Sequence, residues 1–308
     1  MIELIATAES VEQSKQLIDA GVDYLYVGED EFGLRLPHSF SLEEIGQVVE
    51  IAHAANKKVI VAVNALFHND RIEKLKDYLT ELERLNVDAI TTGDPGAVRI
   101  LQKNEFNLDY IYDAQTLVTN STQINFWGKR GAIAGVLARE LTFEELQELA
   151  ENVIIPVETL VYGATCIHQS KRKLVQNYFN YVDQEVPESM ASRELFLSES
   201  NKENHYSIYE DMNGTHVFAT DDVNLMTQLD KLVDLGLKQW KLDGIFSPGE
   251  NFVKIVKLFD EARTHFQNGT WTEEVMNELN EKLHDLHPPH RSLDEGFFLK
   301  DPDSIESK

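Results

Sequence analysis

Two arginines, Arg35 and Arg139, are the side chains with the most informative chemistry in this sequence. A planar guanidinium binds a carboxylate through paired hydrogen bonds, so two arginines at one pocket would suit a small dicarboxylate-like metabolite. His68 could assist proton transfer there, although a histidine in a polar stretch also fits an ordinary surface loop. Arg139 is followed directly by Glu140 after an apolar run, and this pair fits either a structural clamp or a ligand contact.

Polar residues also follow the other apolar, strand-like segments of the chain. Loops are usually polar, so this pattern indicates a functional site only if the segments end at the same place in the fold. If they do, the candidate catalytic residues are His68, Glu140 and Glu158, and the candidate ligand-binding residues are Arg35, Asn64, Gln115, Arg139, Tyr162 and Lys241.

Cys166 is the only cysteine, which excludes an internal disulfide and any metal site built from several cysteines of this chain. A nucleophilic pair with His168 is conceivable, but two residues this close in sequence seldom align for proton transfer, and a structural cysteine is expected. The sequence has no phosphate-binding glycine loop, dinucleotide-binding fingerprint, zinc-binding His-Glu-x-x-His helix or serine nucleophile elbow. No metal-binding residues are therefore assigned.

The elements that would bring these residues together alternate between strands and helices. Eight apolar strand-like segments are each followed by a helix-like segment, which predicts a (β/α)₈ TIM-type barrel; a doubly wound open sheet is the alternative. In such a barrel the functional residues lie at the carboxyl ends of the strands. The expected strands lie at 4–6, 24–27, 59–63, 89–91, 110–112, 135–137, 154–155 and 239–242, and the expected helices at about 10–20, 41–56, 71–85, 95–103, 120–130, 142–151, 222–235 and from 248 onward.

The chain has 308 residues, more than the roughly 250 that one barrel needs. We assign residues 1–265 to the barrel and residues 266–308 to a C-terminal helix and tail. The regular pattern breaks between about 181 and 213, where the polar, turn-rich run 198–204 indicates an irregular insertion after the seventh strand.

The composition is strongly acidic, with 28 Lys and Arg against 53 Asp and Glu and a formal net charge of −25. Nucleic-acid affinity depends largely on neutralising phosphates with Lys and Arg, so tight RNA binding by this chain alone is not expected. The densest basic run is Lys171-Arg172-Lys173, and Lys129-Arg130 is a weaker second. No apolar run approaches the roughly 20 residues of a membrane span, no leader segment is evident, and the cytoplasm is the expected compartment.

The segment from Glu158 to Cys166, with a glycine at Gly163, resembles the signature of the collagenase-like peptidase family U32. That signature has a Glu, a hydrophobic residue and then Gly-Ala-x-Cys. The resemblance extends over most of the predicted barrel, and it implies a barrel fold. Further matching segments are Ala20-Gly21-Val22-Asp23, Tyr26-Val27-Gly28, Arg35, Asn64, Asp94-Pro95-Gly96, Gln115 with Asn120, Phe126-Trp127, Arg139-Glu140-Leu141, Asn213-Gly214-Thr215, Asp221-Asp222 and Lys241-Leu242-Asp243-Gly244.

The departures from this family pattern concern its cysteines. Lys171 and Lys173 stand where the family has a second glycine and a second cysteine, two further cysteines are absent, and Ile245 replaces a family arginine. Cluster-bearing relatives hold a four-iron–four-sulfur cluster through four cysteine thiolates. We therefore expect this chain to bind no cofactor itself and the cluster to occur only in a cysteine-bearing partner.

The chain resembles the short, cysteine-poor member of a pair whose longer homologue keeps the four cysteines. The resemblance implies an accessory or partner role in prephenate-dependent hydroxylation of tRNA wobble uridines, with tRNA bound only by the complex. Prephenate is a dicarboxylate and would suit the two arginines. A stand-alone collagenase-like peptidase and a non-catalytic metabolite-binding barrel remain as alternatives, although the sequence shows no proteolytic motif.

Overall fold

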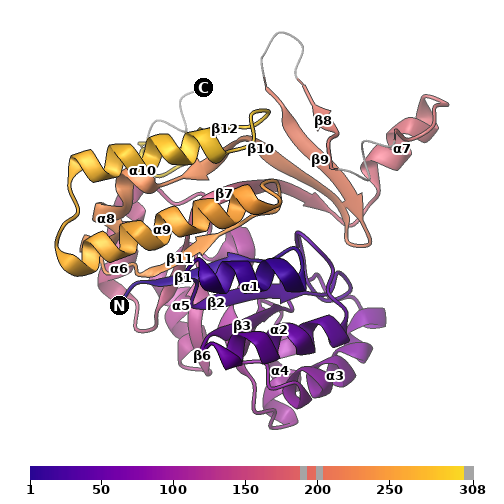
Figure 1. Cartoon of the computed structure of the whole chain (residues 1–308). Helices are drawn as coiled ribbons and strands as arrows, with labels where there is room; N and C mark the ends of the chain where they lie inside the picture. The colour runs from indigo at the N-terminus through magenta and orange to yellow at the C-terminus, as the bar shows by residue number, and fades with distance from the viewer. Residues whose placement is uncertain (188–192, 199–203, 302–308) are drawn as a thin grey trace.

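A closed barrel of eight parallel strands forms the centre of the computed structural model, which describes residues 1–187, 193–198 and 204–301 (Figure 1). Each barrel strand pairs in parallel with the next, and the last strand pairs with both the seventh and the first, which closes the sheet. The predicted TIM-type barrel is confirmed and the open sheet is excluded. The barrel strands are β1 (Glu3–Thr7), β2 (Tyr24–Gly28), β3 (Lys58–Ala62), β4 (Ala89–Thr92), β5 (Asp109–Tyr112), β6 (Ala132–Val136), β7 (Val157–Ser170) and β11 (Gln239–Leu242).

Helices surround this barrel and begin where the sequence provides caps. Ser41 and Glu44 form the expected capping box, because the Ser41 side chain accepts from the Glu44 amide while the Glu44 carboxylate accepts from the Ser41 amide. Among the described residues, no helix is both long and apolar enough to cross a bilayer. The helices around the barrel are α1 (Val11–Asp19), α2 (Leu42–Ala54), α3 (Asn69–Arg84), α4 (Pro95–Lys103), α5 (Ser121–Gly128), α6 (Phe143–Asn152), α8 (Leu229–Asp234) and α9 (Glu250–Asn268).

The alternation of side chains along each strand divides the core into two parts. Leu4 and Ala6 of β1 point outward into the large core beneath the helices, whereas Ile5 belongs to the small core inside the barrel. The inner core consists mainly of small and branched side chains, namely Ile5, Tyr26, Leu36, Ile60, Ala62, Ala89, Ile111 and Ala134.

Two elements begin at residues other than those that the sequence predicts. The strand expected at 154–155 begins instead at Val157, so Glu158 lies inside β7 and not in a loop after it. Residues expected to start a helix at Asp222 belong to strand β10 (Gly214–Asn224), and the helix α8 begins only at Leu229. In both places a buried carboxylate interrupts an apolar pattern and hides the strand from a hydropathy-based prediction.

The expected irregular insertion at about 181–213 contains strands at 196–197 and 206–211, whereas residues 182–187 form neither helix nor strand. The second half of β7 pairs antiparallel with β10, and β10 pairs with β9 (Tyr206–Asp211). The short strand β8 (Phe196–Leu197) and the helix α7 (Leu174–Tyr181) complete this unit, which we call the arm (residues 164–218). Figure 1 shows the arm projecting from the barrel. Residues 188–192 and 199–203 of the expected insertion lie outside the described residues.

The C-terminal helix and tail pack against the barrel and the base of the arm. Helix α10 (Glu273–Leu286) contacts α9, and strand β12 (Ser292–Asp294) pairs in parallel with β10. Arg291 forms a buried ion pair with Asp222, at 2.5 Å between Nη2 and Oδ1. The Tyr162 hydroxyl lies 2.8 Å from both Ser247 Oγ and His287 Nδ1, so this β7 side chain ties the tail to the barrel.

His287 should make the fold sensitive to acid. Burial, together with the positive charge of Arg291, lowers the pKa of His287 to about 4. Below the ordinary histidine pKa the unfolded chain therefore takes up a proton that the folded chain does not, and stability falls as the pH drops. Urea unfolding should show a loss of about 2 kcal/mol from this residue between about pH 7 and about pH 5.

The His287→Gln variant should lack this part of the pH dependence, whatever its stability at neutral pH. His205→Gln, which changes an exposed histidine, is the matched control and should keep the wild-type dependence. An unchanged slope of stability against pH in His287→Gln would contradict the assignment.

Candidate functional site

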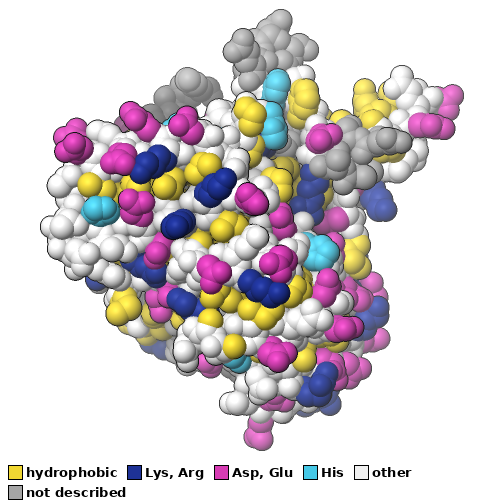
Figure 2. All heavy atoms as spheres, viewed as in Figure 1, with side chains coloured by type: hydrophobic (Ala, Val, Ile, Leu, Met, Phe, Trp, Pro, Cys, Tyr) yellow, Lys and Arg dark blue, Asp and Glu magenta, His cyan; other side chains and the backbone are white. Residues whose placement is uncertain are grey.

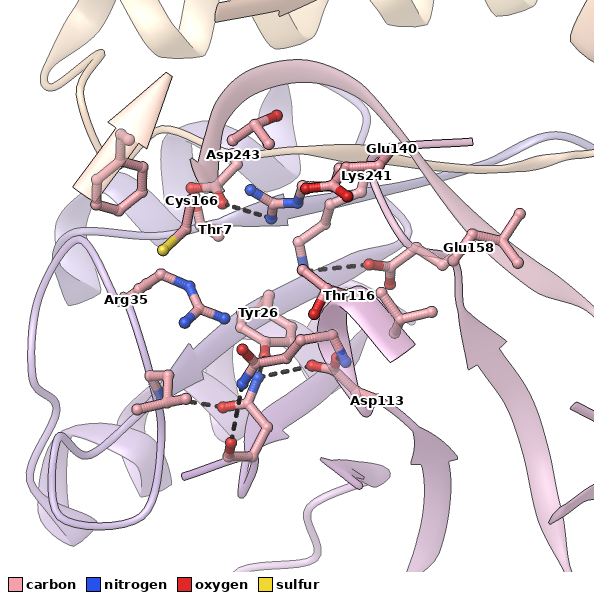
Figure 3. Close-up of a pocket in the computed structure, with 18 residues that line it drawn as sticks. Thr7, Tyr26, Arg35, Asp113, Thr116, Glu140, Glu158, Cys166, Lys241 and Asp243 are labelled. Atoms are coloured by element: carbon pink, nitrogen blue, oxygen red, sulfur yellow. Dashed lines mark hydrogen bonds and ion pairs between the residues drawn. The ribbon is translucent and has the colours of Figure 1, made fainter. Parts of the chain in front are cut away.

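A pocket opens at the carboxyl end of the barrel strands, where the polar residues converge (Figure 3). Of the residues expected from sequence, Arg35, Asn64, Gln115, Arg139, Glu140, Glu158 and Lys241 line this pocket, as does Cys166. The polar and aromatic part of the wall is completed by Thr7, Tyr26, Asp113, Thr116, Thr165, Phe218 and Asp243. The prediction that the strand ends bring these side chains together is confirmed; their binding and catalytic roles remain predictions.

Two candidates, His68 and Tyr162, do not line this pocket. His68 is exposed at the N-terminus of α3, where its side chain makes no capping hydrogen bond. Tyr162 points to the outer side of β7 and is fully buried. Its hydroxyl forms hydrogen bonds with Ser247 and His287. A side chain on the outer face of a barrel strand does not reach the interior, so we give neither residue a part in the site.

Arg139 pairs with Asp243 and not with Glu140, which corrects the expected pair. Its Nη2 lies 3.2 Å from Asp243 Oδ2, and its Nη1 donates to the Ala164 carbonyl oxygen. Glu140 is exposed at the edge of the pocket. The ion pair of Arg139 with Asp243 therefore joins the loops after β6 and β11 and orients the Arg139 guanidinium toward the pocket.

Arg35 is the second guanidinium of the pocket. Its Nη1 donates to Gln169 Oε1 at 2.9 Å, and within the described part of the chain no ion pair to its guanidinium is found. Arg35 has a left-handed backbone, with φ of 55°, which turns the loop after β2 toward the barrel mouth. Figure 3 shows its guanidinium beside the Cys166 sulfur. Among the described residues this charge is not paired with a carboxylate, so it can bind an anion.

Glu158 and Lys241 face one another inside the barrel. The distance from Lys241 Nζ to Glu158 Oε1 is 3.8 Å, and both residues are only 4% exposed. Burial raises the pKa of Glu158 and lowers the pKa of Lys241, and each partner's charge opposes the shift of the other. Glu158 Oε2 has no hydrogen-bond partner among the described residues. The pair can accept or release a proton in contact with a bound ligand.

Asn64 and Gln115 hold the wall of the pocket together. The Asn64 side chain accepts from the Leu34 amide at 3.0 Å and donates to Asp113 Oδ2 at 2.6 Å. Asp113 Oδ1 accepts from the Gln115 amide at 3.0 Å, and Gln115 Nε2 donates to the Asn64 carbonyl oxygen. Most of the hydrogen-bonding groups of these side chains therefore hold the loops after β3 and β5 in place.

Sequence reasoning missed a histidine that lies beside Cys166. His168, the expected neighbour, is exposed and offers the thiol only its backbone carbonyl oxygen, 3.3 Å from Sγ. The imidazole within hydrogen-bonding reach of the thiol belongs to His216 of β10, whose Nε2 lies 3.0 Å from Asp211 Oδ1. Only the antiparallel pairing of β7 with β10, which was not expected, brings these residues together.

Gly163 lets β7 bend from the barrel into the arm. Its φ is 124°, and a Cβ atom there would lie 2.4 Å from the Asp243 carbonyl oxygen. The glycine of the signature segment is therefore required both for its backbone conformation and for the close approach of β11.

The described residues show no group of side chains arranged to bind a metal ion. In the described ranges, no three His, Cys, Asp or Glu side chains gather in a way that could hold a metal ion. Lys171 and Lys173 are exposed at the turn before α7. With one cysteine in the sequence, the chain does not supply the four thiolates that hold a four-iron–four-sulfur cluster.

A closed (β/α)₈ barrel whose strand ends gather charged side chains around one pocket defines a protein of the TIM-barrel class. The family model of peptidase family U32 matches residues 9–308. This chain belongs to peptidase family U32.

Curated relatives cover most of the chain. It is 37% identical over 302 residues to tRNA hydroxylation protein P2 of Bacillus subtilis, an alignment that spans 97% of this chain and 98% of that protein. It is 29% identical over 245 residues to tRNA hydroxylation protein P1 of the same organism, spanning 79% of this chain but only 58% of P1. An uncharacterized protease, MJ0090 of Methanocaldococcus jannaschii, is 26% identical over 98% of this chain and 74% of its own length.

Gly163→Ala should destabilise the fold strongly, because the new methyl group meets the Asp243 carbonyl oxygen. We expect a loss of about 3 kcal/mol in urea unfolding, from backbone strain and overpacking together. Gly236→Ala is the matched control, because Gly236 also has a positive φ, of 76°, but has nothing within 4 Å of a Cβ. It should cost only about 1 kcal/mol. Equal losses in both variants would contradict the close approach of β7 and β11.

Proposed function

We propose that this chain takes part in tRNA wobble-uridine hydroxylation as the partner of a longer, cysteine-bearing homologue. The observation that carries the proposal is the 37% identity to tRNA hydroxylation protein P2, which extends over nearly the full length of both chains. Bacillus subtilis also has the homologous protein P1, most of whose additional length lies outside the alignment. A short and a long family member thus occur together in one organism, and both names refer to the same modification.

The pocket supports binding of a small carboxylate such as prephenate. Arg35 has no ion-pair partner in the described ranges, and Arg139 is held toward the pocket by Asp243. Two guanidinium groups at one opening suit a dicarboxylate, because each can bind one carboxylate with two hydrogen bonds. Lys241 adds a third basic group deeper in the same pocket.

The charge distribution supports RNA contact only through a complex. Figure 2 shows many Asp and Glu side chains scattered over the visible face, without a continuous basic surface. Lys171-Arg172-Lys173 lies on the arm, whereas Lys129-Arg130 follows the C-terminal end of α5, at the opposite end of the barrel. The two basic runs therefore do not form one groove.

The arm has features of a surface that binds a protein. Several large hydrophobic side chains are exposed on it, and the basic run lies at the start of its helix α7. Apolar side chains gathered near charged ones are typical of protein interfaces. We therefore assign the contact with the longer homologue to the arm, and place the iron–sulfur cluster in that partner. The exposed side chains are Ile167, Leu174, Tyr178, Tyr181, Phe196, Leu197 and Met212.

A stand-alone peptidase is the second candidate, and one observation favours it. Cys166 lies near His216, whose imidazole pairs with Asp211, and cysteine hydrolases also use this order of residues. Cleavage of gelatin by the purified chain, abolished in Cys166→Ser, would support this alternative. A barrel that binds a metabolite without transforming it is the third possibility, and it predicts binding without any effect on tRNA.

Removal of either guanidinium should weaken carboxylate binding. A charge-assisted bidentate pair contributes about 1.5–3 kcal/mol, so Arg35→Ala and Arg139→Ala should each raise the Kd for prephenate about tenfold or more in calorimetry. Arg130→Ala is the matched control, because Arg130 stacks on Phe126 away from the pocket. Unchanged affinity in both pocket variants would contradict this binding mode.

Deletion of the gene should lower the hydroxylated wobble uridines, measured by mass spectrometry of tRNA nucleosides. The wild-type gene should restore them, and a double charge reversal, Lys171→Glu with Lys173→Glu, should restore them less well because it weakens the complex. Lys129→Glu with Arg130→Glu is the control with the same change of charge at the other end of the barrel. It should behave as wild type.

The same proposal predicts how tRNA binding depends on the partner. The isolated chain should show no salt-sensitive tRNA binding near physiological ionic strength, whereas its complex with the longer homologue should bind. Tight binding by the isolated chain, with the steep salt dependence that phosphate neutralisation produces, would refute the need for a partner. Normal nucleosides in the deletion strain would refute the role in hydroxylation.

A further inference from the structure

Cys166 lies at the mouth of the pocket, against a fully buried histidine of the neighbouring strand. In the pairing of β7 with β10, Cys166 is opposite Phe218, and His216 lies two positions before Phe218 in β10. The His216 side chain is 0% exposed. Its Nδ1 has no hydrogen-bond partner among the described residues, while the thiol donates to the His168 carbonyl oxygen at 3.3 Å. A buried nitrogen without a partner next to a thiol is a proton acceptor in position for it.

The His216 ring is held so that this nitrogen remains the acceptor. Its Nε2 lies 3.0 Å from Asp211 Oδ1, and the same oxygen accepts from the Asn213 amide at 2.7 Å. The ring also packs on Tyr209, with ring centroids 4.9 Å apart. A carboxylate at Nε2 fixes the tautomer that has its proton there, which leaves the Nδ1 lone pair directed away from Asp211.

The surrounding charges favour a thiolate. Burial by itself opposes ionisation of Cys166, but the nearby His216 imidazole and the positive charges of Arg35 and Arg139 together lower the pKa of the thiol. Burial likewise opposes protonation of His216, but Asp211 and Cys166 raise its pKa above the ordinary value. Each group thus stabilises the charged form of the other, as in known thiolate–imidazolium pairs.

We propose that Cys166, His216 and Asp211 form a nucleophilic site that adds reversibly to the carbonyl group of a 2-oxo carboxylate bound by Arg35 and Arg139. Both arginines and Cys166 line the same pocket, and Figure 3 shows Arg35 beside the sulfur. The guanidinium groups bind the carboxylate, and this places the adjacent carbonyl carbon at the thiolate. The proposal rests on the carboxylate pocket of the proposed function.

The addition needs no oxidant, reductant or further reactant. The thiolate electron pair forms a carbon–sulfur bond to the carbonyl carbon, and the electron pair of the carbonyl π bond moves to the oxygen. That oxygen takes the Nδ1 proton of the His216 imidazolium, which Asp211 has stabilised. The product is a neutral thiohemiketal hydroxyl, and reversal of the same steps releases the 2-oxo acid unchanged.

Alkylation of the full-length chain tests the thiolate directly, because Cys166 is its only cysteine. The rate with iodoacetamide, measured between about pH 5 and about pH 9, follows the thiolate fraction. The wild-type rate should stay high well below the ordinary thiol pKa. At about pH 6.5, His216→Gln should react about tenfold or more slowly and regain the profile of an ordinary thiol.

The matched control is His168→Gln, which changes the exposed histidine near Cys166 in sequence and should keep the wild-type profile. Asp211→Asn should lie between wild type and His216→Gln. The ultraviolet absorbance of the thiolate, with Cys166→Ser as the blank, gives the same titration independently of reagent access. An ordinary thiol profile in the wild-type chain would overturn the proposal, even if a variant fails to fold.

Protection from alkylation tests the ligand class. Pyruvate has a carbonyl group next to its carboxylate, whereas lactate has the same carboxylate without a carbonyl. Pyruvate should therefore slow the alkylation of Cys166 far more than lactate. Equal protection by both, or protection by neither, would overturn the addition step. These measurements need no tRNA or partner, so their failure is distinguishable from normal tRNA nucleosides in the deletion strain, which would refute the proposed function.

Discussion

The bend in strand β7 is the constraint on which the site depends. The strand starts as a barrel strand between β6 and β11, and it continues past Gly163 as the base of the arm. Its first half directs Glu158 into the barrel, and its second half places Cys166 at the mouth. The positive φ of Gly163 and the absence of a side chain allow the Asp243 backbone to approach at this bend. The pairing with β10 begins at Tyr162, before the bend, and continues beyond it to Cys166, which lies opposite Phe218.

A second constraint is electrostatic, because the pocket of a chain with a net charge of −25 brings three basic side chains together with four acidic ones. The basic ones are Arg35, Arg139 and Lys241, and the acidic ones are Asp113, Glu140, Glu158 and Asp243. Arg139 is neutralised in part by Asp243, but Arg35 has only a neutral amide as its partner in the described ranges. The acidic surface repels large anions such as a phosphate backbone, whereas the proposed function needs only a local attraction of the guanidinium groups for a small carboxylate. The same two charges stabilise an ionised Cys166. If the proposed ligand binds, its binding and the ionisation of the thiol are coupled: a bound carboxylate screens the arginines and raises the energy of the thiolate, which favours its addition to the ligand.

The sequence was sufficient to predict the barrel fold because apolar strands and amphipathic helices alternate along the chain. It located most of the pocket because parallel strands deliver their following residues to one end of a barrel. It failed at β7 and β10, where buried Glu158 and Asp222 interrupt the apolar pattern. The compensating partner of Asp222 is Arg291, far along the chain, and hydropathy does not reveal such a pair. Tyr162 was misassigned because its position in β7, and hence the face it occupies, was wrong. His216 was missed because its contact with Cys166 depends on an antiparallel pairing outside the regular barrel order.

The chemistry available to this site depends on what the thiolate meets. Hydrolysis of a peptide needs a leaving group and a water molecule after the acyl step, so it requires a substrate that passes through the pocket with both sides of the scissile bond. A 2-oxo acid has no leaving group at its carbonyl carbon, so addition of the Cys166 thiolate stops at a reversible adduct. Cys166 is the only cysteine of the sequence and lies near the His216 imidazole. In the proposed site, a thiolate at the mouth of a carboxylate-binding pocket therefore suits reversible addition to a small 2-oxo acid and not cleavage of a polymer.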